Sequence, residues 1–288
     1  MSSVKFNKII IKNISGVSYL ATSLINTPLK VFNPNSYSHW CHIVLSNYGG
    51  GFISGDNISI EITCKSHSLL YLGSQGNTRI YKQTESKESS QSISGLVESQ
   101  AVAVIAPDPT VLHRGSHFQN KQMWNLASDA NLLLTDWILS GRLECNESFL
   151  YDSYSSEIGI RRESELVLLD QLNSTPGELD PNVIGRFGPY RTLLNIFLIG
   201  NKVSRITEEL QEFCYFNEKR RLRDLVREPQ VTPTYPDRFC SLSQFMHDGY
   251  IFRALGKNKS DLEHYYTLVI TLLMKQGLLS FNPIRRKY

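Results

Sequence analysis

The feature that most limits the fold of this 288-residue chain is a strand–turn–strand pattern, recurring without intervening helices from residue 58 to about 140. The second strand of each unit begins at Leu69, near Val102 and near Leu132. This spacing of about 30 residues lies in the range of stacked structural repeats. Chains that repeat strands in this way build packed or coiled sheets. A generic β-sandwich and a coiled, helix-like winding of strands both remain open at this point.

Hydrophobic periodicity indicates that the strands are covered to different extents. Ile58, Ile60 and Ile62 alternate with polar residues, whereas residues 132–134 form a continuous apolar run. Alternation is typical of a strand covered on one face, and a continuous run is typical of a strand covered on both. Some strands should therefore lie between two layers.

Helical signals are confined to the last third of the chain. Apolar residues at helical spacing predict one helix over residues 203–214 and another over 261–276. For the second helix, Ser260 is the predicted N-cap and Gly277 the predicted end. Phe245–Leu255 is predicted to be a strand between them. The expected fold is mainly β, with two α-helices added in the C-terminal third.

Composition and charge exclude several classes of function. A net charge of +3 is too small to predict a nucleic-acid or membrane partner. The longest apolar stretch, residues 193–199, is short and interrupted by Asn195, so no membrane span is expected. The N-terminal sequence lacks the apolar core of a signal peptide. The scattered cysteines suit the reduced thiols of a cytoplasmic protein: Cys41, Cys64, Cys145, Cys214 and Cys240.

A glycine-rich stretch at residues 46–56, SNYGGGFISGD, could be a phosphate loop or a turn that directs a carboxylate. A Walker loop requires Gly-Lys-Ser/Thr, but here Gly55 is followed by Asp56, which would repel phosphate. A dinucleotide fingerprint requires a following helix, whereas a β-like alternation follows here. The glycines are better explained by positive-φ turns and close backbone approach.

Other candidate motifs carry weaker signals. His39 and His42 form one pair and His113 and His117 another, but neither has a neighbouring carboxylate cluster, so core or solvated histidines are the simpler interpretation. No G-x-S-x-G elbow is present in the sequence. Residues 217–228 are rich in basic residues interleaved with acids, which is typical of a solvated helix face and less often of a partner-binding surface.

Two carboxylates lie in apolar surroundings. Asp136 lies within LLLTDWILSGR, and Asp170 ends ELVLLD. A carboxylate in an apolar strand costs several kcal/mol unless it is paired, hydrogen-bonded, metal-bound or open to water. Either Asp136 pairs with Arg142 at the end of the strand, or these acids line a polar path through the β-structure. The pattern alone leaves both interpretations open.

Four motifs, taken together in their order and spacing, resemble those of the urease accessory proteins called UreD or UreH, in particular the eukaryotic members. They are GG-x-x-x-GD at residues 50–56, QGNTRIY at 75–81, PDP at 107–109 and DWILSGR at 136–142. The resemblance is specific over about residues 40–175 and compatible with the rest. It implies a single UreD-like domain over residues 1–288.

The family resemblance implies a coiled, two-layer, β-helix-like stack of sheets with two helices, and no catalysis of its own. Such proteins bind apo-urease and recruit UreF-type partners and UreG-type GTPases, so that nickel is delivered to the urease active site. The resemblance further implies an internal tunnel for Ni²⁺, which would be transient cargo rather than a permanent cofactor.

Site residues follow from the motif positions. The implied nickel-conduit residues are Asp56, Thr78, Asp136 and Asp170. Nickel would bind transiently at Asp56 and Asp136, with no fixed metal site. The implied structural residues are Gly50, Gly51, Gly55 and Arg142, the last fixing the turn beside the conduit. Oxygen ligands would bind a borderline ion such as Ni²⁺ loosely enough to release it. Two alternatives are a hydrolase using Asp136 or Asp56 with a histidine, and a nickel-storage protein.

Overall fold

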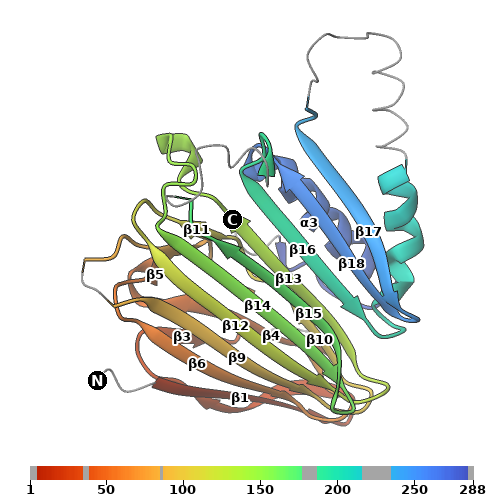
Figure 1. Ribbon diagram of the computed structural model, residues 1–288. Coiled ribbons are helices and arrows are strands. Elements are labelled where there is room, and N and C mark those ends of the chain that lie inside the picture. Colours follow the sequence, from red (N-terminus) through yellow and green to blue (C-terminus); the bar gives the residue numbers. More distant parts are fainter. Residues whose placement is uncertain (1–4, 35–38, 85–86, 177–186, 216–234, 285–288) are drawn as a thin grey trace.

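The computed structural model describes residues 5–34, 39–84, 87–176, 187–215 and 235–284. Two β-sheets pack face to face, and helices cover the outer face of one sheet (Figure 1). The mainly β, coiled two-layer fold predicted from the sequence is confirmed. The basic segment at 217–228 lies outside the described residues.

The first sheet has seven strands, parallel in its centre and antiparallel at both edges. In spatial order they are β15 (Glu165–Ser174), β14 (Ser153–Arg162), β12 (His117–Leu126), β9 (Ser89–Val97), β6 (Asn57–Cys64), β1 (Lys5–Ile14) and β2 (Val17–Leu24).

The second sheet has a main path of eight strands and a three-stranded branch. The path runs β17 (Arg238–Met246), β18 (Gly249–Gly256), β16 (Thr192–Ile199), β13 (Asn131–Leu139), β10 (Val102–Ile105), β7 (Leu69–Ser74), β4 (Cys41–Asn47) and β3 (Leu29–Phe32). The branch starts at β13 and consists of β11 (Thr110–Leu112), β8 (Thr78–Ile80) and β5 (Gly51–Phe52).

The recurring sequence unit is a coil that contributes one strand to the first sheet and one or two strands to the second. From β6 to β14 the chain alternates between the sheets, so that like strands stack in parallel. Leu69, Val102 and Asn131 start three such strands and lie side by side in register. The helix-like winding, and not a generic sandwich, is therefore the outcome of the repeat.

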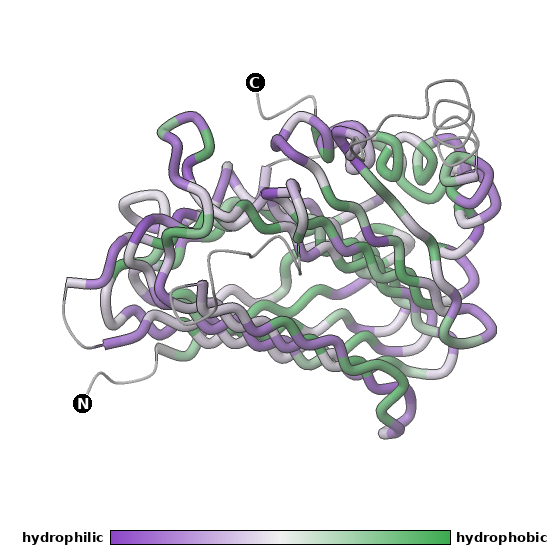
Figure 2. Tube along the Cα trace, turned by 45° about the horizontal axis from the view of Figure 1, so that its top comes forward, coloured by the Kyte–Doolittle hydropathy of each residue, from purple (hydrophilic) through white to green (hydrophobic). Residues whose placement is uncertain are grey.

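Burial follows the predicted periodicity. Ile58, Ile60 and Ile62 point between the sheets and are at most 1% exposed. On β13, Leu134 faces the first sheet while Leu133 belongs to the cluster beneath the helices. Figure 2 shows hydrophobic residues recurring along the strands of both layers and hydrophilic residues at many of the turns. The second sheet is thus buried on both faces, which explains its continuous apolar runs.

The long helix α3 (Lys259–Lys275) begins two residues earlier than predicted. Asn258, not Ser260, is the N-cap, because its side chain and that of Asp261 form a reciprocal capping box. Gly277 follows the helix with a φ of 69°, consistent with its predicted role. No described helix combines the length and hydrophobicity needed to span a bilayer.

Two other predicted elements differ from the structure. Helical residues begin with the 3-10 turn η3 (Ser204–Ile206) and continue at 207–215, close to the predicted range. The strand predicted at Phe245–Leu255 is confirmed over 249–255, where it is β18, but it begins too early, since a hairpin turn at 247–248 separates β18 from β17. Two further 3-10 turns are η1 (Tyr48–Gly50) and η2 (Leu143–Cys145).

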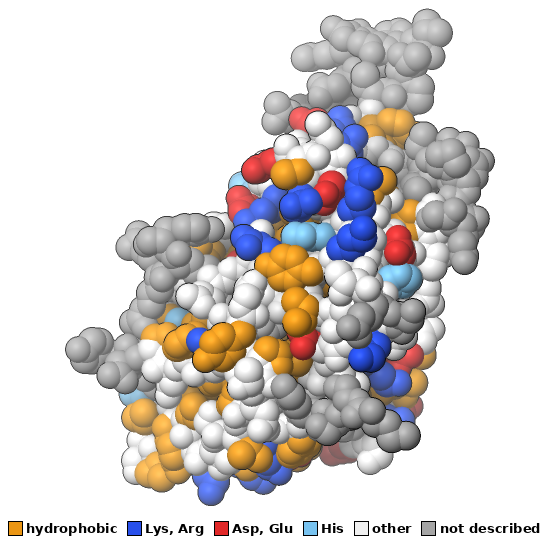
Figure 3. Space-filling model, turned by 90° about the vertical axis from the view of Figure 1, so that its left-hand side faces the viewer, with side chains coloured by type: hydrophobic (Ala, Val, Ile, Leu, Met, Phe, Trp, Pro, Cys, Tyr) orange, Lys and Arg blue, Asp and Glu red, His pale blue; other side chains and the backbone are white. Residues whose placement is uncertain are grey.

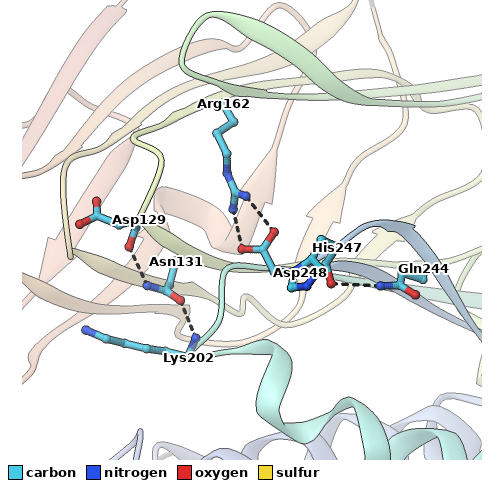
Figure 4. Close-up of polar contacts among 7 residues, drawn as sticks. All are labelled: Asp129, Asn131, Arg162, Lys202, Gln244, His247 and Asp248. Carbon is cyan, nitrogen blue, oxygen red and sulfur yellow. Dashed lines mark hydrogen bonds and ion pairs between the residues drawn. The ribbon is translucent and has the colours of Figure 1, made fainter.

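A buried ion pair joins the two sheets at one end (Figure 4). Arg162 at the end of β14 donates from Nη1 to Asp248 Oδ1 at 2.8 Å and from Nη2 to Oδ2 at 3.2 Å. The side chains are only 15% and 12% exposed. Nearby, Asn131 accepts a hydrogen bond from the Lys202 backbone at 2.8 Å. The Arg162–Asp248 pair holds the β17–β18 turn against the first sheet, and the Asn131–Lys202 contact joins β13 to the loop after β16.

Candidate functional site

A cavity of about 290 Å³ lies between the two sheets. This volume has room for several water molecules. Both sheets contribute polar residues to its wall, as does the loop after β10. They include Gln91, Asn120 and Gln122 from the first sheet, and Thr78, Asp108 and Asp136 from the second sheet and that loop.

The first sheet presents polar residues where its neighbours are apolar. On β12 the inward positions are Phe118, Asn120, Gln122 and Trp124, so two polar residues interrupt an apolar face. The parallel register sets Gln91 on β9 beside Asn120. Ser156 on β14 lies on the other side of Asn120. A row of polar side chains therefore crosses three strands.

The second sheet carries a matching row. On β13, Asp136 shares its face with Leu134 and Ile138, which belong to the core between the sheets. Asp136 lies opposite Asn195 on β16, and Asn195 lies opposite Arg253 on β18. Together with Asp170 on β15, the two rows form what we call the polar band: Gln91, Asn120, Ser156, Asp170, Asp136, Asn195 and Arg253.

Hydrogen bonds connect the two rows. Asn120 Nδ2 donates to Ser156 Oγ at 3.3 Å, and Ser156 Oγ donates to Asp136 Oδ2 at 3.3 Å. At the far side, Arg253 donates from Nη2 to Asp170 Oδ1 at 2.5 Å. The band thus bridges the space between the sheets.

Burial raises the pKa of Asp136 from its usual 3.8 to about 6. The hydrogen bond from Ser156 lowers that pKa, the negative charge of Asp170 raises it, and the positive charge of Arg253 lowers it. Asp136 is nevertheless only partly shielded, since it also borders the cavity. This carboxyl can therefore change its charge near neutral pH.

One buried oxygen at the cavity, Asn120 Oδ1, has no hydrogen-bond partner among the described residues, and its residue is 8% exposed. A buried polar atom without a partner costs about 1–3 kcal/mol. In native proteins such atoms are usually satisfied by water or by a ligand. The cavity is therefore suited to a hydrated or polar occupant.

The glycine-rich stretch is a turn beside the cavity. Gly50 has a φ of 75°, and a Cβ on Gly51 would overlap the Arg79 carbonyl. Both observations confirm that the glycines serve a positive-φ turn and a close approach. Asp56 does not belong to the described cavity wall, and its Oδ2 accepts a hydrogen bond from the Ile53 backbone at 2.9 Å.

The structure therefore brings only some of the predicted conduit residues together. Thr78 and Asp136 line the cavity, and Asp170 lies at the Arg253 side of the polar band. Asp56 lies apart, in the turn that it closes. Gly55, with a φ of 82°, belongs to the same turn.

Arg142 does not pair with Asp136. Its Nε donates to Glu147 Oε2 at 2.8 Å, and its Nη2 donates to Glu147 Oε1 at 2.5 Å. The reason is direction, since Asp136 points between the sheets whereas Arg142 lies in the turn beyond β13. Arg142 fixes that turn, and the paired interpretation of Asp136 is wrong.

The histidines form structural contacts. His42 packs its ring between two aromatic rings, and His113 contacts Tyr81 edge-on with 5.2 Å between centroids. His117 Nε2 lies 3.0 Å from Asp152 Oδ2. Among the described residues, no three or more His, Cys, Asp and Glu side chains cluster as metal ligands would. Any metal at the polar band must use mixed oxygen ligands.

The family model described as "UreD urease accessory protein" matches residues 8–287. The chain belongs to the UreD family. It is 32% identical over 281 residues to the urease accessory protein UreD of Cytophaga hutchinsonii, covering 95% of this chain and 94% of that protein. It is 26% identical over 250 residues to the urease accessory protein D of Arabidopsis thaliana, covering 85% and 83%.

A fungal relative extends the comparison. The UreD-family chain is 28% identical over 231 residues to an uncharacterized urease accessory protein ureD-like of Schizosaccharomyces pombe, covering 76% of this chain and 78% of that one. Relatives named as urease accessory proteins thus span bacteria, plants and fungi. The family membership predicted from the ordered motifs is confirmed.

Sequence reasoning missed five residues of the polar band in this UreD-family chain: Gln91, Asn120, Ser156, Asn195 and Arg253. A signal existed for two of them. Asn195 interrupts the longest apolar stretch, and Arg253 lies within the apolar strand GYIFRALG. The cost argument applied to Asp136 applies equally to them. Gln91, Asn120 and Ser156 lie in polar stretches and gave no such signal.

Proposed function

We propose that this chain is a non-enzymatic scaffold and metallochaperone of urease maturation. It binds apo-urease together with UreF-type and UreG-type partners in the cytoplasm, and it conducts nickel to the urease active site. The observation that carries this proposal is the polar band, which joins a cavity between two apolar sheet faces to the Asp170 and Arg253 side of the molecule.

The ligand chemistry of the band supports transient rather than permanent binding. Its donors are carboxylate, amide and hydroxyl oxygens, which hold a borderline divalent ion less tightly than thiolate or imidazole ligands do. The buried thiols offer no competing trap, since burial raises the pKa of Cys41 to about 12 and raises that of Cys64 as well. Nickel is cargo in this proposal, with no permanently bound cofactor.

Surface charge supports delivery by a docked partner rather than capture of free ions. The β5 end of the molecule faces the viewer in Figure 3, where Lys and Arg side chains gather in the upper half and outnumber the Asp and Glu side chains among them. Arg79, opposite Gly51 of β5, and Arg114, just beyond β11, are both exposed. Exposed cations repel a free divalent ion and favour an acidic protein surface.

Reconstitution tests the proposal. The chain is co-expressed with its cognate urease and the UreF-type and UreG-type proteins, and urea hydrolysis is assayed with added nickel. We expect activity only when the chain is present, and a severalfold loss with Asp136→Ala although the complex still assembles. Asp152→Ala is the matched control, because Asp152 is 55% exposed and contacts His117 outside the band. Equal activity without the chain contradicts the proposal.

One observation favours a second candidate, a hydrolase that uses Asp136. A carboxyl with a pKa raised to about 6 by burial is typical of a general acid. However, the described cavity lining contains no histidine to complete an acid–base pair. Turnover of ester, amide or phosphate substrates by the isolated chain, abolished by Asp136→Asn, is the result that would favour the hydrolase.

A further inference from the structure

Arg253 places a positive charge where a cation conduit would need its ligands. Its guanidinium donates to Asp170 Oδ1 at 2.5 Å and to Asn195 Oδ1 at 3.1 Å. Asp136 lies on the same row, directly opposite Asn195, and the charge of Arg253 acts on it. Arg253, a cation that belongs to the chain itself, therefore contacts one carboxylate and one amide oxygen, and its charge also reaches the carboxylate of Asp136.

The guanidinium is the accessible member of this group. The Arg253 side chain is 42% exposed, whereas that of Asp170 is 18% exposed. An ion pair that reaches solvent is weak, because water and salt screen it. Deeper in the band, Asn120 Oδ1 is buried without a hydrogen-bond partner among the described residues. Withdrawal of Arg253 would leave oxygens from both sheets without a counter-cation.

We propose that Asp136, Asp170 and Asn195 form a divalent-cation site and that Arg253 is its resident counter-ion. Nickel moving along the polar band occupies this site by displacing the guanidinium into solvent. This inference rests on the proposed conduit function and adds a residue that regulates occupancy. With Arg253 in place, the guanidinium neutralises one of the two carboxylate charges and occupies the site, which is then closed to a second cation.

The exchange makes binding reversible. The site is open only in the fraction of molecules in which the guanidinium has withdrawn. The apparent affinity for the ion is therefore the affinity of the open site multiplied by that fraction. When the guanidinium returns, it competes with the bound ion for Asp170. Arg253 therefore lets a site with two carboxylates release its cargo.

Calorimetric titration of the purified full chain with Ni²⁺ tests the inference. We expect Arg253→Gln to bind Ni²⁺ at least about tenfold more tightly than the wild type, because one positive charge no longer opposes the ion. Arg253→Lys keeps the charge and should stay close to the wild type. Adding Asp170→Asn to Arg253→Gln should reverse the gain. Thermal unfolding verifies that each variant is folded. If Arg253→Gln does not fold, Arg253→Met takes its place as the variant without the positive charge.

The matched control is Arg162→Gln, which removes the other arginine–aspartate pair between the sheets. Arg162 lies four residues beyond Ile158, the β14 position that pairs with Asp170, and outside the polar band. Its Ni²⁺ affinity should equal that of the wild type. Unchanged affinity in Arg253→Gln, or an equal gain in Arg162→Gln, overturns the inference.

Urease activation separates this inference from the conduit proposal. Tighter Ni²⁺ binding by Arg253→Gln with unchanged urease activation supports the cation site and counts against a conduit through it. Unchanged Ni²⁺ binding with impaired activation overturns the cation site and leaves the maturation role standing.

Discussion

Asp136 is a carboxyl that borders the cavity between the sheets and costs folding free energy there. Its carboxyl lies among Leu134, Ile138 and the polar band, and its folded pKa is raised to about 6. When the pKa of an acid is higher in the folded state than in the unfolded state, the shift adds to the free energy of unfolding. This stabilisation is complete below the unfolded-state pKa and is lost as the pH rises through the folded-state pKa. Above about pH 6, the native state therefore carries the cost of a buried carboxylate.

We predict that Asp136→Asn stabilises the fold near neutral pH. The pKa rise from 3.8 to about 6 corresponds to about 1–3 kcal/mol, with the lower end expected because the carboxyl borders the cavity. Thermal unfolding from about pH 4 to about pH 8 measures the effect, and the difference from wild type should shrink towards the acid end. A variant less stable than wild type at neutral pH contradicts this account.

The residue scale also shows how far sequence reasoning reaches. The cost of a carboxylate in an apolar strand identified Asp136 correctly as unusual, but the one partner that sequence distance offered for it, Arg142, is not its partner in the structure. The actual contacts, Ser156 and the Asp170–Arg253 pair, come from strands that only register places nearby. Without knowledge of register, no spacing rule could have named them.

At the scale of elements, the glycine turn depends on two different constraints. Gly50 has a left-handed φ of 75°, whereas Gly51 is extended and lies directly against the Arg79 backbone where β5 pairs with β8. The first constraint concerns backbone conformation and the second concerns space. The motif alone predicts that glycine is needed but not which constraint acts at which position.

We predict that Gly51→Ala destabilises the protein more than Gly50→Ala does. The added methyl group must separate β5 from β8, at a cost of about 2–4 kcal/mol, whereas a left-handed alanine costs about 1–2 kcal/mol. Urea unfolding measures both. Gly16→Ala is the control, because Gly16 has a φ of 84° with open space around it and should behave like Gly50→Ala. Equal losses at Gly50 and Gly51 would refute the packing argument.

At the scale of the whole molecule, the coiled winding of the strands was the feature most open to prediction from the sequence. The side-chain contacts that join one layer to another were the least predictable. A repeat of about 30 residues fixes which strands stack, because each unit returns the chain to the same position. The helical layer follows from apolar spacing as well. The contacts that join layers, such as Arg162 with Asp248 and Cys214 with Cys240, link distant residues whose proximity depends on the finished fold.

The cysteine contact between the helical layer and the sheet edge leads to a last prediction. The Sγ atoms of Cys214, in the helical residues 207–215, and Cys240, on the edge strand β17, lie 3.4 Å apart. A disulfide requires about 2.05 Å, so an approach of about 1.4 Å suffices. Oxidised glutathione should form this bond by two thiol exchanges, releasing two molecules of reduced glutathione.

The bond should raise the midpoint of thermal unfolding by several degrees, because it closes a loop between residues 26 apart in sequence. Mass spectrometry of the alkylated, unreduced protein after digestion should identify the Cys214–Cys240 cross-link, and Cys240→Ser should abolish both the cross-link and the stabilisation. Cys145, which is exposed, serves as the control, since Cys145→Ser should leave both unchanged. If only mixed disulfides with glutathione form, the helical layer does not hold the two thiols together as the structure shows.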